Sequence, residues 1–157
     1  SSAVYVILLY VGERILSDYL LTVSMLRGEK MNNIMVCVTK QKTCERLINY
    51  GKKLKSSDED QLFVIHVAED KYHFLGSEKE GEALEFLYEK AKEAGASLTV
   101  EKSEDVIGTL IDIVDRHQIT EVIAGQSGDP EGEDGFLRRF QRSLSGKARL
   151  IVVPAVS

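Results

Sequence analysis

Short, mainly apolar runs alternate with amphipathic stretches along most of the chain. The runs cover residues 34–38, 62–67, 96–101, 121–124 and 150–153. Between consecutive runs, apolar residues recur three or four positions apart, which is the spacing of one face of an α-helix. Strands that alternate with helices predict a mainly parallel sheet, and right-handed crossovers place helices on both of its faces. We therefore expect an α/β fold with a doubly wound, five-stranded parallel sheet.

Local signals predict where two of the helices begin and where one of them ends. Thr43 is placed to cap the first helix, whose predicted apolar face contains Cys44, Leu47, Ile48, Gly51 and Leu54. Ser77 and Glu80 have the spacing of a capping box. The helix that follows has a predicted buried stripe of Ala83, Leu84, Leu87, Tyr88 and Ala91. Gly95 is placed to end that helix.

The N-terminal residues form a segment of different character. Residues 3–11 are apolar, but this run is about half of the roughly 20 residues that a membrane-spanning helix requires. Apolar residues then recur at helical spacing as far as Leu26, and a polar break at 27–30 predicts a domain boundary near Lys30. We expect an accessory segment at 1–30 and one domain at 31–157.

Three accounts of the accessory segment stay open at this stage. Residues 3–26 either pack on the domain or its dimer mate, form the cytoplasmic end of a truncated transmembrane helix, or lie on a membrane surface. The last two accounts predict association with a membrane or a membrane protein.

Composition narrows the classes of partner. The chain has 20 basic and 25 acidic residues, a formal net charge of −5. A nucleic-acid-binding surface must be positive to displace counterions, so we expect no nucleic-acid partner. Two cysteines without a secretory leader indicate a reducing cytoplasm rather than a disulfide framework. No cysteine and histidine cluster has metal-ligand spacing, and we expect no metal site.

Several short motifs resemble those of the universal stress protein family. They are the opening strand Ile-Met-Val-Cys-Val, then Cys44-Glu-Arg-Leu47, Val64-Ile-His-Val67, Gly125-x-x-Gly128 and Val152-Val-Pro154. The resemblance covers roughly residues 32–155. It implies an adenine nucleotide alpha hydrolase-like sheet with strand order 3-2-1-4-5, in which ligands bind at the carboxyl ends of the strands.

The resemblance also implies a ligand site, with departures from the family pattern. Nucleotide-binding members carry an aspartate after the first strand, and here Thr39 takes its place. Their glycine pattern is Gly-x-x-Gly, nine residues, then Gly-Ser/Thr, but Arg138 stands at the third glycine position and Gly135 arrives early. We therefore expect weak binding of ATP or AMP. The expected binding residues are Thr39, Lys40, Gln41, Val67, Gly125, Ser127 and Gly128.

These departures resemble the stress-protein-like domain of bacterial potassium-sensor histidine kinases and its free-standing relatives. Some of those relatives bind a cyclic dinucleotide through a serine-rich first loop, whereas this chain has Thr39-Lys-Gln-Lys-Thr43. The resemblance implies a regulatory or sensory module. The alternative is an interaction domain that binds no nucleotide and is attached to a membrane transporter or sensor kinase.

The sequence contains no motif that indicates catalysis. We find no nucleophile elbow, Walker loop or paired catalytic carboxylates, so we do not expect an enzyme, and a nucleotide hydrolase is the weakest option.

Family relatives dimerise through the last strand, and residues 150–153 are apolar enough to form such an edge, so we expect a homodimer. His66, His73 and His117 form no triad with a recognisable nucleophile motif, so we expect them to be structural. Cys37 falls in a predicted buried strand and Cys44 begins the apolar stripe of the first helix, so we expect both to be core residues, with a reactive thiol at Cys44 as the alternative. The basic residues Arg138, Arg139, Arg142, Lys147 and Arg149 are expected to form a solvated face, with contact to a phosphate or an acidic partner as the alternative.

Overall fold

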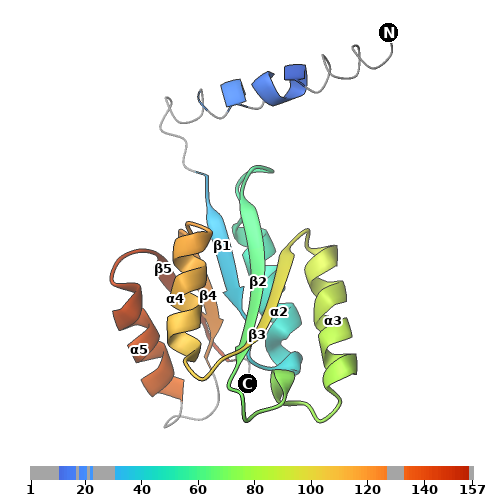
Figure 1. The fold of residues 1–157 in the computed structure, drawn as a ribbon, viewed down its shortest axis with the longest axis vertical. Helices are drawn as coiled ribbons and strands as arrows, with labels where there is room; N and C mark the ends of the chain where they lie inside the picture. The colour runs from blue at the N-terminus through green and yellow to red at the C-terminus, as the bar shows by residue number, and fades with distance from the viewer. Residues whose placement is uncertain (1–10, 17, 21, 23–30, 127–132, 156–157) are drawn as a thin grey trace. The chain divides into compact units, whose positions relative to one another are not determined.

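The computed structural model describes residues 11–16, 18–20, 22, 31–126 and 133–155. The chain divides into two units, residues 1–31 and 32–157. The second unit contains a five-stranded sheet in the order β3-β2-β1-β4-β5, in which all neighbouring strands are parallel (Figure 1). The predicted fold class and strand order are therefore confirmed.

Helices and strands alternate along this unit as the sequence predicts. The elements are β1 (Asn33–Cys37), α2 (Gln41–Leu54), β2 (Gln61–Ala68), the short turn η1 (Phe74–Gly76), α3 (Glu80–Glu93), β3 (Ser97–Lys102), α4 (Val106–Arg116), β4 (Glu121–Gly125), α5 (Glu133–Leu144) and β5 (Arg149–Val153). Gly95 has a φ of +70° after α3, as a helix-ending glycine should.

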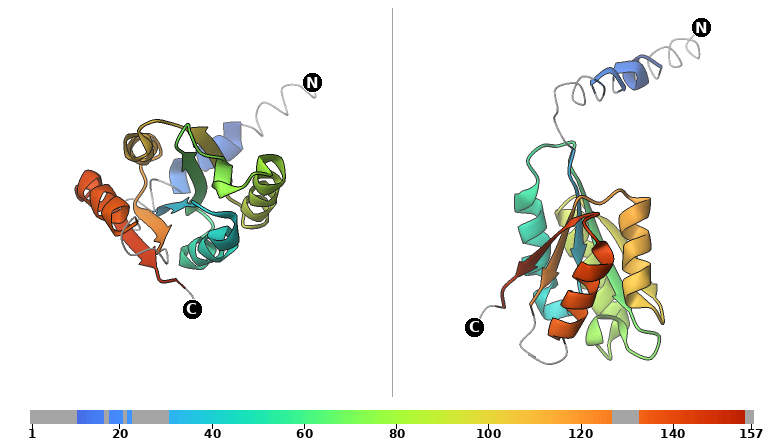
Figure 2. Two further views of the ribbon diagram at one scale, coloured as in Figure 1. Left: turned by 90° about the horizontal axis from the view of Figure 1, so that it is seen from below. Right: turned by 90° about the vertical axis from the view of Figure 1, so that its left-hand side faces the viewer.

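The sheet is buried between two layers of helices (Figure 2). Helices α2 and α3 cover one face, and α4 and α5 cover the other. Residues of β1 alternate between the two sides, so Ile34 and Val36 belong to the first core and Met35 to the second. All three are fully buried. A central parallel strand that is buried on both faces consists of consecutive apolar residues. The apolar run at 34–38 was therefore sufficient to predict this strand.

Two predicted helix starts are wrong. Lys40, not Thr43, is the N-cap of α2, because the loop after β1 is short; the Thr43 hydroxyl donates to the Lys40 carbonyl at 3.3 Å. No capping box forms at α3, whose N-cap is Lys79. The Glu80 carboxylate instead accepts the N–H of Phe74 at 2.9 Å and so stabilises η1. Tyr88, predicted to be buried, is 55% exposed.

A buried carboxylate fixes the start of β1. Asp60 is 3% exposed and accepts hydrogen bonds from the backbone N–H groups of Asn32 at 3.0 Å and Ser56 at 2.8 Å. Burial raises the pKa of Asp60, but these bonds and the Ser56 hydroxyl outweigh burial and lower the pKa below its usual value. Asp60 is therefore ionised at neutral pH and joins β1 to the loop after α2.

The N-terminal unit is described only in part. Residues 11–16, 18–20 and 22 are helical. Their large apolar side chains are exposed: Val11, Ile15, Leu16, Tyr19 and Leu20. Within the described residues, no helix has both the length and the apolar character needed to cross a membrane. Association of residues 3–26 with a membrane or a dimer mate stays a prediction.

Candidate functional site at the carboxyl edge of the sheet

A cavity lies where the carboxyl ends of β1, β2 and β4 meet. The chain leaves β1 toward β2 on one side of the sheet, and β4 lies on the other side, so this is the switch point at which open α/β sheets bind ligands. The cavity has a volume of about 310 Å³. We name it the central pocket; its lining residues are Cys37, Val38, Thr39, Ile65, Val67, Glu69, Glu104, Asp105, Val106, Ile107, Leu110, Ala124, Gly125, Phe136, Leu137 and Arg139.

The floor of the central pocket is apolar. It is formed by strand residues Cys37, Ile65 and Ala124, all of them buried. Burial raises the pKa of the Cys37 thiol to about 12, so the thiol stays protonated at neutral pH and behaves as a small apolar group. Cys44 is also buried, and burial raises its pKa. Both cysteines are core residues, as the sequence predicts. An apolar floor of this kind suits the flat face of a heteroaromatic ring.

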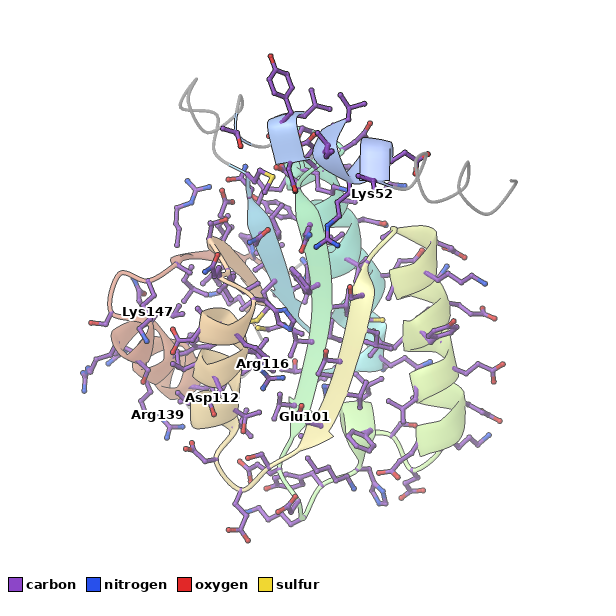
Figure 3. The ribbon with its side chains drawn as sticks, turned by 45° about the horizontal axis from the view of Figure 1, so that its top comes forward. Lys52, Glu101, Asp112, Arg116, Arg139 and Lys147 are labelled. Carbon is purple, nitrogen blue, oxygen red and sulfur yellow. The ribbon has the colours of Figure 1, made fainter. Side chains whose placement is uncertain are left out.

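Charged side chains are distributed unevenly around the rim of the pocket. Glu69 follows β2, and Glu104 and Asp105 follow β3. One Asp105 carboxylate oxygen accepts the N–H of Gly108 at 3.0 Å and caps α4. Arg139 stands on α5, across the pocket. Figure 3 labels Arg139 on α5, and also Glu101 near the end of β3. The rim is therefore negative near β2 and β3 and positive near α5.

A second, more open cavity of about 320 Å³ lies beside the central pocket. We name it the side pocket; its lining residues are Thr39, Lys40, His66, Val67, Ala68, Glu69, Tyr72, His73 and Gly76. The two pockets share Thr39, Val67 and Glu69. Thr39 is exposed, so it forms part of the rim between them.

His66 supports the wall between the pockets. It is 3% exposed, and both ring nitrogens have partners: Nδ1 lies 2.6 Å from the Val38 carbonyl, and Nε2 accepts the N–H of Leu75 at 2.9 Å. One neutral tautomer, with the proton on Nδ1, satisfies both bonds. Burial lowers the pKa of His66, although the bond to Val38 opposes this shift. The ring therefore holds η1, where Leu75 has a φ of +56°, against the end of β1.

The structure brings together part of the predicted set of binding residues. Thr39, Val67 and Gly125 line the central pocket, and Lys40 lines the side pocket. Gln41 is the first residue of α2 and lines neither pocket. Ser127 and Gly128 lie outside the described residues. Lys42, the next residue of α2, lines a groove on the outer face of this helix.

Gly125 has a structural reason to be glycine. A Cβ atom there would lie 3.3 Å from Leu47 Cδ1, which is a tight contact. The three described glycines with positive φ are Gly76, Gly95 and Gly146, so Gly125 does not depend on that conformation. Its missing side chain lets α2 approach β4.

Sequence reasoning missed the charged and α5 residues of the central pocket. They are Glu69, Glu104, Asp105, Phe136, Leu137 and Arg139. The acidic residues follow predicted strands directly, so the rule that ligands bind at strand ends would have selected them. The α5 residues carry no such signal, because their position depends on how that helix packs on the sheet.

The basic residues form a mainly solvated surface. Arg138, Arg139 and Arg142 are exposed. Lys147 pairs with Asp115 at 3.0 Å, and Arg149 pairs with Glu121 at 3.3 Å. This agrees with the predicted solvated face, while Arg139 also reaches the pocket.

No protein-family model matches the sequence, and no curated protein matches it either. Solved structures do resemble the fold. A universal stress protein in complex with cAMP is 11% identical, with a TM-score of 0.51 over 80% of this chain and 98% of that one. A protein from the universal stress protein family from Burkholderia pseudomallei is 14% identical, with a TM-score of 0.55 over 80% of this chain and 98% of that one. The hypothetical protein MJ0577 is 15% identical, with a TM-score of 0.53 over 82% of this chain and 99% of that one.

This chain matches almost the whole length of each of these structures, and two of them belong to the universal stress protein family. The resemblance seen in the sequence motifs is confirmed at the level of the fold, while the relationship to sensor kinases stays a prediction. The chain has the fold of the universal stress proteins.

Proposed function

We propose that this chain is a universal stress protein-like regulatory module that binds an adenine nucleotide weakly in the central pocket. The observation that carries the proposal is the position of this cavity at the switch point of the sheet, with an apolar floor and polar groups on its rim. The cAMP complex of a universal stress protein with the same fold supports a nucleotide as the class of ligand.

Weak binding follows from the rim of the pocket. Thr39 offers one hydroxyl where an aspartate would accept two hydrogen bonds from a ribose. The N-terminus of α2 has no side-chain cap and no acidic residue in its first turn, which favours an anion there. Lys40 beside it, however, lines the side pocket rather than the central one. A ligand in the central pocket therefore depends mainly on burial of its ring.

We infer a regulatory role rather than catalysis. Both nitrogens of His66 are engaged in structural hydrogen bonds. Burial raises the pKa of both cysteine thiols, so neither is an activated nucleophile. Among the residues that the structure describes, no group of three or more histidine, cysteine, aspartate or glutamate side chains is arranged to hold a metal ion. These observations favour ligand-dependent signalling through the surface around the pocket.

A bulky side chain at the rim tests the proposed site. We expect AMP to bind with a Kd between about 10 µM and 1 mM in a calorimetric titration. Thr39→Trp should weaken AMP binding by at least about tenfold, because the indole ring fills the mouth of the pocket. Asn49→Trp, on the exposed outer face of α2, is the matched control and should bind as the parent does. Equal affinity of the Thr39 variant and the parent would place the ligand elsewhere.

We also propose a homodimer formed through β5. This strand is an edge of the sheet, and Val152 on it is 40% exposed. An apolar sheet edge with free backbone groups favours pairing with a second chain. Light scattering at micromolar concentration should give the dimer mass, and Val152→Lys should shift the protein to monomer. A parent protein that is monomeric under these conditions would refute the dimer.

A further inference from the structure

The charges around the central pocket restrict what its ligand can carry, if the proposed nucleotide site is correct. Three carboxylates line the pocket on the side of β2 and β3, and Arg139 is the one cation among the lining residues. Within the described chain, no lysine or arginine pairs with Glu104 or Asp105, while Glu69 lies 3.6 Å from Lys71 in an exposed pair.

Helix α4, whose first residues line the pocket, does not compensate for these carboxylates. A helix N-terminus binds a phosphate through free N–H groups and its positive dipole end. At α4, however, Asp105 already occupies this position and accepts the N–H of Gly108. Lys102, the last residue of β3, lies 3.6 Å from Glu80 and 4.8 Å from the centre of the Phe74 ring. Neither group is available to neutralise a polyphosphate.

The same carboxylates are good partners for N–H groups. An ionised carboxylate accepts hydrogen bonds only, and its bonds with N–H donors are stronger than neutral ones. A base with an exocyclic amine therefore fits near β2 and β3. At the opposite side, Arg139 is exposed and its Nε lies 3.4 Å from the Gly135 carbonyl. One guanidinium can hold one phosphate, which as a monoester carries about −1.5 to −2 charges at neutral pH.

We propose that the central pocket selects a nucleoside with at most one phosphate group and discriminates against the triphosphate. The N–H donors of the base face Glu69 and Glu104, and the phosphate faces Arg139. A triphosphate brings additional negative charge into a rim that already has an excess of carboxylates, and like charges in a partly buried site repel each other. This inference rests on the proposed nucleotide site and states which phosphorylation state the site accepts.

Calorimetric titrations with adenosine, AMP and ATP test the proposal. They should be made with the full chain, with EDTA present, so that no divalent cation masks the charge of ATP. We expect ATP to bind at least about tenfold more weakly than AMP. The double variant Glu69→Gln/Glu104→Gln should raise the affinity for ATP relative to that for adenosine by at least about fivefold. Both ligands lose the same charge-assisted bonds to the base, but only ATP is relieved of repulsion. Both side chains are exposed, so the fold should tolerate the substitutions. Glu85→Gln, an exposed position on α3, is the matched control.

A second variant tests the assigned orientation of the ligand. Arg139→Gln should weaken AMP binding by at least about fivefold and leave adenosine binding unchanged. ATP binding as tight as AMP binding, or an unchanged ratio of ATP affinity to adenosine affinity in the double variant, would overturn the inference while the proposed site stands. Failure of all three ligands to bind would instead refute the proposed function itself.

Discussion

Replacing His66 by leucine should lower the free energy of unfolding by about 2–4 kcal/mol at pH 7.5, because two buried backbone groups lose their partners. The Val38 carbonyl and the Leu75 N–H both bond to the ring, which is 3% exposed. Leucine has a similar volume but no donor or acceptor. The loss should be measured by urea denaturation of the parent and the variant.

The difference in free energy of unfolding between the parent and His66→Leu should depend on pH. Burial lowers the pKa of His66 in the folded protein, whereas in the unfolded chain it should be near the reference value of about 6.5. The unfolded state therefore takes up the proton first as the pH falls. The contribution of neutral His66 is fully present above about pH 6.5 and decreases toward the folded pKa, by up to about 1.4 kcal/mol per pH unit.

The stability difference between the parent and His66→Leu should consequently shrink between pH 7.5 and pH 5. Every other side chain is the same in both proteins, so this difference reports on His66 alone. A difference that stays constant over this range would show that His66 is not held as the buried neutral form.

Replacing Gly51 by alanine should lower the free energy of unfolding by about 2 kcal/mol. Helix α2 lies so close to the sheet that a Cβ atom at Gly51 would be 2.7 Å from Val36 Cγ2 and 2.9 Å from Leu62 Cδ1. Both partners are buried in the centre of the sheet and have little space to move. Overpacking should therefore outweigh the gain of up to about 1 kcal/mol that alanine brings to a helix.

Gly81→Ala is the matched control for this substitution. Gly81 lies in the exposed first turn of α3, and a Cβ atom there would have no neighbour within 4 Å. The control should raise the free energy of unfolding by about 0.5–1 kcal/mol. Thermal and urea denaturation of both variants measure the contrast. If Gly51→Ala were as stable as the parent, α2 would not be seated on the sheet as closely as described.

Much of this fold was predictable because its central strands are buried on both faces. Residues 34–38 alternate between two cores but are all apolar, so this run is visible without knowledge of its partners. The capping interactions were not predictable in the same way. Glu80 has the spacing of a capping box, but it binds Phe74 because η1 folds back beside α3. Asp60 likewise accepts from Asn32, which is 28 positions away in sequence.

The site shows the same division between local and tertiary information. Strand ends are visible in the sequence, and Thr39, Val67 and Gly125, which lie at such ends, line one cavity. The contributions of α4 and α5 depend on how these helices pack, so Arg139 was assigned to a solvated face. Lys40 and Lys42 both follow β1 closely in the sequence, but α2 begins at Gln41, so Lys42 lies on the outer face of the helix.

The central claim, that a nucleotide binds in the central pocket, is tested most directly by nuclear magnetic resonance of the nitrogen-15-labelled protein during addition of AMP. We predict saturable shifts of the backbone amide signals of Thr39, Val67 and Gly125, together with Val106 and Ile107 at the start of α4. The signals of Asn49 and Tyr50 on the outer face of α2 should stay in place. Shifts confined to that outer face, or no shifts at millimolar AMP, would contradict the account.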